Sequence, residues 1–224
     1  MKESRVPSFS ILTPTAGKRP RALACAVESV ARALAELPVQ LEMLVGLDGC
    51  DEETAFAGIS ELPEFLRVFK FPGWGNFGNR VRNALMRAAG GDYLLFLDDD
   101  NALTPGALAA FSGHLPADMV VARIDVSRAF EKPYLPEGEP GEAWVRQCNI
   151  DPLCLCVSRD LALTRCGGWG DAGGYESDFL NIARYFRRAC SVAYCLQVVG
   201  VYDAGRGLDP HGANTRQQKT VAGA

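Results

Sequence analysis

Short apolar runs alternate along this chain with segments of helical periodicity, and this alternation limits the possible folds more than any other feature. Apolar runs bounded by turn residues indicate buried strands, and strands separated by helical segments are typical of a parallel sheet. We therefore predict an α/β fold whose mostly parallel, Rossmann-like central sheet is flanked by helices. The predicted strands are residues 8–13, 41–47, 66–70, 93–97, 118–124 and 153–157. The predicted helices are residues 20–36, 52–60, 78–89, 105–113, 159–165 and 176–188.

Two stretches in the second half of the chain interrupt this alternation. Residues 130–141 hold three prolines and two glycines, which oppose helix and strand alike, so we expect a mobile loop or an insertion without regular structure. Residues 167–174 are rich in glycine and form a second flexible stretch, which ends where the last predicted helix begins.

Composition and charge narrow the class of protein. The 224 residues are 48% hydrophobic, which is ample for a packed core, and the formal net charge is −4 without a basic block, so a broad nucleic-acid surface is not expected. No apolar run is long enough to span a membrane, and residues 1–5 lack the apolar stretch of a signal peptide, so we expect a soluble, cytoplasmic protein.

The eight cysteines form no CxxC pair. We interpret them as small buried side chains in a reducing compartment, with zinc binding or disulfides as the alternatives.

Three adjacent carboxylates follow the strand predicted at residues 93–97, in the stretch Leu97-Asp-Asp-Asp-Asn101. Two like charges about 4 Å apart repel by roughly 1 kcal/mol in water and by about 4 kcal/mol at a partly buried site. We therefore expect a positive group beside Asp98, Asp99 and Asp100. The alternative is a solvated turn that caps the next helix, since aspartates often precede helix N-termini.

Polar segments also follow the first two predicted strands, at Thr13-Pro-Thr15 and at Asp48-Gly-Cys-Asp51. In open parallel sheets ligands bind beyond the carboxyl ends of the strands, so we expect these segments and the three aspartates to converge on one edge. No GxGxxG opens the first loop and no GxxxxGK[ST] occurs, so neither the usual dinucleotide fold nor a P-loop is supported. A divalent ion that bridges diphosphate oxygens is another way to hold a nucleotide, and adjacent aspartates suit Mg²⁺ or Mn²⁺.

Four sequence blocks in this order resemble family 2 glycosyltransferases of the GT-A fold: residues 9–15 (FSILTPT), 45–54 (VGLDGCDEET), 82–83 (RN) and 89–101 (AGGDYLLFLDDDN). The resemblance implies one GT-A domain over residues 1–224. About residues 1–115 would bind the nucleotide, and about 116–224 would bind the acceptor and supply the catalytic base. It also implies an inverting, metal-dependent transfer of a sugar from a nucleotide diphosphate sugar, most readily a UDP-sugar, to an acceptor hydroxyl.

The same resemblance implies roles for individual residues. Asp100 would be the main ligand of Mn²⁺ or Mg²⁺, supported by Asp98, and His211 would either complete the metal site or belong to an exposed tail. Asp48 would contact the uracil or the ribose, although Leu47 and Ala16 depart from the residues usual in the family. The residues implied in donor binding are Thr13, Pro14, Thr15, Asp48, Asn79, Arg80, Arg82, Asn83, Asp98, Asp99 and Trp169.

Transfer to a hydroxyl needs a group that accepts its proton, and a carboxylate within hydrogen-bond reach can do so. The resemblance implies Asp178 as this base, with Glu176 in reserve. The alternative is that both are first-turn acids that complement the helix dipole. Trp169 is expected either to stack on a sugar or to pack in the core, and Asp151 lies where the family places a substrate contact.

Two other functions remain open from the sequence. A sugar-phosphate nucleotidyltransferase also combines such a sheet with aspartate-bound Mg²⁺, but it usually carries a glycine-rich basic loop of which residues 13–19 are a faint version. A non-catalytic nucleotide-sugar-binding protein is the third hypothesis. The acceptor is left open among glycans, small molecules, proteins and lipid-linked groups, and an oligomer is compatible with the sequence.

Overall fold

The structure, a computed structural model, describes residues 7–172, 174–209 and 212. Its strands are β1 (Ser8–Thr15), β2 (Gln40–Asp48), β3 (Leu66–Phe71), β4 (Tyr93–Phe96), β5 (Ala102–Leu103), β6 (Met119–Asp125), β7 (Tyr134–Leu135), β8 (Leu155–Ser158) and β9 (Val192–Val201). Its α-helices are α1 (Pro20–Glu36), α2 (Glu52–Ala55), α3 (Asn79–Ala88), α4 (Ala107–Ser112) and α5 (Ser177–Arg188). Short 3-10 or π turns are η1 (Asn76–Gly78), η2 (Glu142–Trp144), η3 (Pro152–Cys154), η4 (Asp160–Arg165) and η5 (Gly174–Glu176).

All nine strands of the described residues belong to one sheet, in the order β3-β2-β1-β4-β8-β6-β9-β5, with β7 paired to β6. β3, β2, β1 and β4 are parallel neighbours, and β8 runs antiparallel to both β4 and β6. β9 is parallel to β6, whereas β5 and β7 run against their partners. Six strands therefore point the same way, which confirms the predicted mostly parallel sheet.

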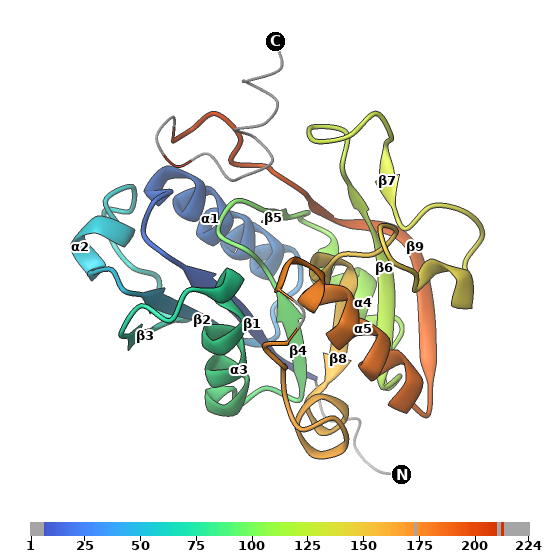
Figure 1. Ribbon diagram of the computed structural model, residues 1–224. Helices are drawn as coiled ribbons and strands as arrows, with labels where there is room; N and C mark the ends of the chain where they lie inside the picture. The colour runs from blue at the N-terminus through green and yellow to red at the C-terminus, as the bar shows by residue number, and fades with distance from the viewer. Residues whose placement is uncertain (1–6, 173, 210–211, 213–224) are drawn as a thin grey trace.

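Helices cover both faces of this sheet. α3 and α5 lie on the face toward the viewer in Figure 1, and α1 and α4 lie on the opposite face. α1 turns Leu23, Val27 and Val30 inward, as its apolar residues at steps of three and four require. α3 approaches β2 closely because Gly46 has no side chain; a Cβ there would collide with the Cγ1 atom of Val81. This close packing brings the N-terminus of α3 to the carboxyl end of the sheet.

Three strands, β5, β7 and β9, are not predicted by the sequence pattern. β5 and β7 are two residues long, which is too short to produce a visible alternation. β9 shows no regular alternation of buried and exposed residues, and its register with β6 shifts beside Arg123. Because β7 lies within residues 130–141, the expectation that this stretch lacks regular structure is wrong at Tyr134 and Leu135.

The boundaries of three other predicted elements are corrected. The helix predicted over residues 52–60 ends at Ala55, and beyond it Gly58 packs against the start of α1, where a Cβ would lie 2.8 Å from the carbonyl oxygen of Pro20. The strand predicted from residue 153 begins at Leu155, because Pro152 opens the η3 turn. The helix predicted over residues 159–165 is the π turn η4.

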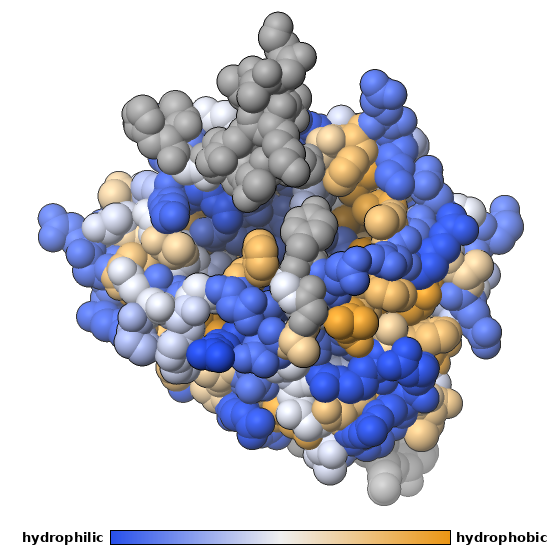
Figure 2. Space-filling model, in the orientation of Figure 1, coloured by the Kyte–Doolittle hydropathy of each residue, from blue (hydrophilic) through white to orange (hydrophobic). Residues whose placement is uncertain are grey.

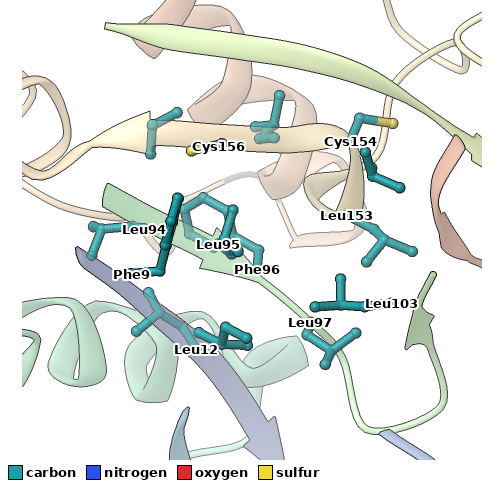
Figure 3. Close-up of a cluster of buried hydrophobic side chains, with 14 of the residues drawn as sticks. Phe9, Leu12, Leu94, Leu95, Phe96, Leu97, Leu103, Leu153, Cys154 and Cys156 are labelled. Atoms are coloured by element: carbon teal, nitrogen blue, oxygen red, sulfur yellow. The ribbon is translucent and has the colours of Figure 1, made fainter. Parts of the chain in front are cut away.

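The hydrophobic core fixes the position of β4 between its neighbours. Figure 3 shows Leu94, Leu95 and Phe96 of β4 between Phe9 of β1 and Cys156 of the strand on the other side. All five side chains are buried, and each large apolar one contributes roughly 1.5–3 kcal/mol to folding. The core therefore determines where the chain leaves β4, and with it the place of the three aspartates that follow.

The surface and the cysteines complete this description. Hydrophilic residues cover most of the face in Figure 2, and the apolar areas among them are broken up. Along the described parts of the chain, no helix combines the length and the apolar character needed to cross a membrane. All eight cysteines are free thiols; Cys154, Cys156, Cys166 and Cys195 are buried, while Cys148 and Cys190 are exposed. The interpretation as buried side chains therefore fails for the last two.

Candidate functional site

The polar segments that follow β1, β2 and β4 meet at one edge of the sheet, as predicted. β1 pairs in parallel with both β2 and β4, so the three strands end side by side. Thr15 is the last residue of β1, Asp48 is the last of β2, and the three aspartates follow β4 directly. This edge is the frame on which the candidate site is built.

Asp99 and Asp100 are bridged by an arginine that the sequence analysis did not single out. The Nη2 atom of Arg19 lies 2.5 Å from Oδ1 of Asp99, and its Nη1 atom pairs with Oδ2 of Asp100. Asp99 also accepts a 2.6 Å hydrogen bond from the Thr15 hydroxyl, which in turn accepts one from the Gly17 N–H. Burial raises the pKa of Asp99 to about 7, against the opposing attraction of Arg19. The expected positive group beside the aspartates is thus supplied, in part, by the chain itself.

Asp98 belongs to a second cluster, centred on Arg82 of α3. The Nη2 atom of Arg82 donates to Oδ1 of Asp98 at 2.6 Å, and its Nη1 atom lies 3.6 Å from Oδ1 of Asp178. Burial alone would lower the pKa of Arg82, but the two carboxylates outweigh it and the pKa is raised. Burial also raises the pKa of Asp178, although Arg82 opposes this, and its Oδ1 atom is buried without a hydrogen bond. A carboxylate at the start of α5 is therefore held next to the aspartates that follow β4.

Trp169 lies behind this cluster and packs in the core rather than facing solvent. Its side chain is 3% exposed, and its indole N–H donates to Oδ1 of Asn79 at 2.8 Å. The guanidinium carbon of Arg82 stands 4.9 Å from the centre of its rings, and Phe96 packs against them at 4.9 Å. The Trp169 backbone N–H donates to Oδ1 of Asn83. These contacts favour the packing alternative for Trp169, and they give Asn79 and Asn83 roles in holding it.

Asp48 holds a loop of its own chain. Its two carboxylate oxygens accept hydrogen bonds from the backbone N–H groups of Trp74 and Gly75, at 2.6 and 2.8 Å. The loop approaches so closely that a Cβ at Gly49 would lie 2.8 Å from the Cα atom of Gly73, and both glycines have a positive φ. The spacing GxGxxG over residues 73–78, between β3 and α3, is a sequence signal that could have pointed to this loop.

The remaining predicted residues are spread around this edge. Thr13 is fully buried in β1, and its hydroxyl makes no hydrogen bond; Pro14 packs beside Gly78. Arg80 is exposed and donates to Asp171 at 2.9 Å.

A pocket of about 420 Å³ on the outer side of α3 is lined by Trp74, Arg80, Asn83, Ala84, Arg87, Trp169, Gly170 and Asp171. Three predicted donor contacts thus line a pocket of which neither Asp98 nor Asp100 is part.

Glu176 and Asp151 differ sharply in their surroundings. Glu176 is exposed and accepts a 2.9 Å hydrogen bond from the side chain of Gln147. Asp151 accepts from the Leu153 N–H, and burial, reinforced by the negative charge of Asp98, raises its pKa to about 8. Asp151 therefore belongs to the electrostatic environment of the Arg82 cluster. His211 lies outside the described residues.

A comparison with known families identifies the class of protein. The model of the family described as "Glycosyl transferase family 2" matches residues 10–163, which is more than half of the chain. The chain belongs to glycosyltransferase family 2. No curated protein matches it.

Comparison with solved structures shows that the chain has the predicted GT-A fold. S. aureus TarS 1-349 superposes with a TM-score of 0.70 at 15% identity, over 87% of this chain and 60% of that one. A mannosyltransferase, PcManGT from Pyrobaculum calidifontis, in complex with GDP-Man and Mn²⁺, superposes with a TM-score of 0.62 at 18% identity, over 91% of this chain and 59% of that one. The chain thus spans about three fifths of the length of these two structures. At this identity the likeness concerns the fold.

The divalent ion implied by the family resemblance needs hard oxygen ligands that can reach it together. Within the described ranges, no three His, Cys, Asp or Glu side chains form a ready-made cage. Magnesium-type sites commonly use one or two carboxylates together with the substrate's phosphates, so such a cage is not required. Asp98 and Asp100 leave the same strand end, and the Asp100 side chain is 12% exposed. The two carboxylates would fit a divalent ion that also binds a diphosphate, provided that the ion pair between Arg19 and Asp100 is broken.

Arg19 and Ser177 are the functional-site residues that the sequence analysis missed. Arg19 lies four residues after Thr15, the last residue of β1. Because β1 ends beside β4, Arg19 could have been proposed as the counter-ion of the aspartates that follow β4. Ser177 accepts a 2.9 Å hydrogen bond from the Asn79 amide and thereby ties the start of α5 to α3. No local pattern indicates this bond, because it joins residues 98 positions apart.

Proposed function

We propose that this chain transfers a sugar from a nucleotide diphosphate sugar, most readily a UDP-sugar, to an acceptor hydroxyl with inversion at the anomeric carbon. The observation that carries the proposal is the shared use of Arg82 by Asp98 at the nucleotide edge and Asp178 at the start of α5. The TarS structures in complex with UDP and with UDP-GlcNAc, and the mannosyltransferase in complex with GDP-Man, support a nucleotide-sugar donor.

Asp178 is the proposed base. Its raised pKa favours acceptance of a proton from the acceptor hydroxyl, and its side chain is 41% exposed, so a substrate can reach it. The acceptor oxygen then forms a bond to the anomeric carbon as the bond to the diphosphate oxygen breaks, and the diphosphate leaves with the electron pair. Glu176 is more exposed and is held by Gln147, which makes it the reserve candidate.

Other residues of the chain orient these groups. Arg82 holds Asp98 and Asp178 in a fixed relation, while Thr15 fixes Asp99. Asp100, with Asp98 and His211, would hold Mn²⁺ or Mg²⁺. When bound, such an ion supplies positive charge that stabilises a leaving diphosphate.

The chain is proposed to divide the work between its halves. Residues 1–115 carry the ends of β1, β2 and β4 and would bind the nucleotide; residues 116–224 carry α5 and would bind the acceptor. Acceptor selectivity is assigned to residues 125–175, which vary most from the regular strand–helix pattern. A cytoplasmic location is proposed from the eight free thiols.

A thermal-shift panel of nucleotide sugars tests the donor assignment. UDP-sugars are expected to raise the melting temperature more with Mn²⁺ than with EDTA, because ligand binding stabilises the folded state by an amount that grows with the logarithm of ligand concentration over Kd. GDP-mannose and ADP-glucose serve as controls for the identity of the nucleobase. Absence of a shift with every nucleotide sugar would refute the donor assignment.

Replacement of Asp178 tests the base. Asp178→Asn should lower metal-stimulated hydrolysis or transfer of the donor by about 10²–10⁴-fold, the usual contribution of a general base, while UDP affinity stays within about twofold. Glu176→Gln is the matched control and should keep most of the activity. The opposite ranking would transfer the role to Glu176. Release of pyrophosphate from a nucleoside triphosphate and a sugar phosphate would support the nucleotidyltransferase hypothesis instead.

A further inference from the structure

Arg19 is the less buried of the two arginines that contact the aspartates after β4. Its two terminal nitrogens go to two different carboxylates, one to Asp99 and one to Asp100. A guanidinium usually presents its fork to one carboxylate, where both bonds are aligned. The bridging arrangement lets one arginine neutralise two neighbouring acids at once.

Arg19 is also the more exposed and the less tightly packed of the two arginines at this edge. Its side chain is 22% exposed, whereas that of Arg82 is 2% exposed and packs over Trp169. Arg19 lies in the loop before α1, directly ahead of Pro20, and makes no side-chain cap there. Asp99 also accepts a hydrogen bond from the Thr15 hydroxyl, a contact that does not involve Arg19.

The charge at this edge changes when a donor arrives. A nucleotide diphosphate adds negative charges next to aspartates that already repel one another. One guanidinium can pair with Asp99 and Asp100 or with the phosphates, but it cannot satisfy both sets. A second cation at Asp100 would release Arg19 for the phosphates.

We propose that Arg19 is the cation that this edge carries before the donor binds, and that it competes with a divalent ion for Asp100. On donor binding Arg19 breaks its ion pair with Asp100 and pairs with the diphosphate oxygens. The same side chain therefore first neutralises the aspartates and then binds the substrate. The inference rests on the proposed function, since it assumes a nucleotide diphosphate as ligand.

The experiment measures two affinities by calorimetry on the full chain after EDTA treatment. With Mn²⁺ alone, Arg19→Gln should bind the ion at least about tenfold more tightly than the wild type, because its competitor is gone. With UDP at saturating Mn²⁺, the same variant should bind about tenfold more weakly, because the diphosphate loses a charge-assisted contact. A merely structural role would not move the two affinities in opposite directions.

Two further variants make the test independent of folding problems. Arg19→Lys keeps the charge as a single point but lacks the planar fork that reaches both carboxylates, so both affinities should fall between those of the wild type and Arg19→Gln. Arg32→Gln removes an exposed arginine in the last turns of α1, paired there with Glu28, and should leave both affinities unchanged. Mn²⁺ alone should raise the melting temperature of Arg19→Gln more than that of the wild type.

The outcomes separate this inference from the proposed function. If Arg19→Gln and Arg19→Lys bind Mn²⁺ no more tightly than the wild type while the wild type binds UDP, the competition is refuted and the function stands. If the wild type binds no nucleotide under any condition, the proposed function fails and the exchange of Arg19 onto a diphosphate fails with it. Tighter Mn²⁺ binding by the variants would then support only the competition for Asp100.

Discussion

Arg82 and Arg165 each contact two carboxylates, yet the pKa values of Asp178 and Asp118 shift in opposite directions. Arg82 contacts Asp98 and Asp178 at the sheet edge, and burial raises the pKa of Asp178 in spite of it. Arg165 pairs through two nitrogens with Asp118 and lies 3.0 Å from Asp160. Its hydrogen bonds lower the pKa of Asp118, and burial is too weak to reverse this.

The difference comes from burial and from the number of acids. Around Arg82 the carboxylates of Asp98 and Asp178 are joined by the carboxyl group of Asp151, so one buried guanidinium faces three acidic groups. The Arg165 side chain is 26% exposed, whereas that of Arg82 is only 2% exposed. Three acidic groups around one buried guanidinium mark a place suited to another cation or to a proton, whereas the ion pair of Arg165 and Asp118 holds two segments together.

Removal of the two arginines should have the largest effect and should differ between the two regions. Arg82→Gln is expected to lower the free energy of unfolding by about 3 kcal/mol or more, because it removes a buried guanidinium that pairs with two carboxylates and packs over Trp169. Arg165→Gln should cost roughly 1 kcal/mol, as for a partly solvated pair. Urea unfolding followed by circular dichroism measures both.

Equal losses in the free energy of unfolding for Arg82→Gln and Arg165→Gln would contradict the difference drawn between the two regions. Arg82→Lys is an intermediate test, since lysine keeps the charge but lacks the planar face that lies over Trp169. Its stability should fall between those of the wild type and Arg82→Gln.

The pH dependence of stability should show the raised pKa of Asp151. In the folded protein Asp151 keeps its proton up to about pH 8, whereas in the unfolded chain it loses it near pH 4, so the folded state binds more protons between these values. The contribution of Asp151 to stability is therefore fully present below about pH 4 and is lost as the pH rises toward 8.

Asp151→Asn removes this dependence while its side-chain oxygen can still accept from the Leu153 N–H. The difference in melting temperature between the variant and the wild type should grow in favour of the variant from pH 4 to pH 8. Parallel curves over this range would show that Asp151 is already ionised in the folded protein.

The ion pair of Arg165 and Asp118 should give a smaller effect of the opposite sign. The lowered pKa of Asp118 comes first from the Arg165 hydrogen bond, and the stability it adds is present above about pH 4 and is lost as the pH falls through its folded value. Asp118→Asn should therefore cost roughly 1 kcal/mol at pH 7 and less at pH 3. Unfolding at the two pH values checks this, and a larger cost at pH 3 would contradict it.

Much of the site was predictable because its residues follow strands whose apolar runs are visible in the sequence. The parallel arrangement of β1, β2 and β4 puts Thr15, Asp48 and the three aspartates on one edge by geometry alone. The positive group expected beside the aspartates could also be inferred, since repulsion between adjacent carboxylates requires one. These conclusions depend only on local pattern and on general rules of sheet topology.

The sequence alone thus determined the strand–helix alternation, the acidic edge and the family resemblance, all of which are written in contiguous residues. Only the tertiary structure decided that Arg19 bridges Asp99 and Asp100, that Asp48 holds the loop at Trp74, and that Trp169 is buried behind Arg82. Each of these pairings joins residues from different elements, and which partner a charged side chain reaches depends on the packing of helices against the sheet. Burial, which raises the pKa of Asp99, Asp151 and Asp178, is likewise a property of the folded chain and of no single segment.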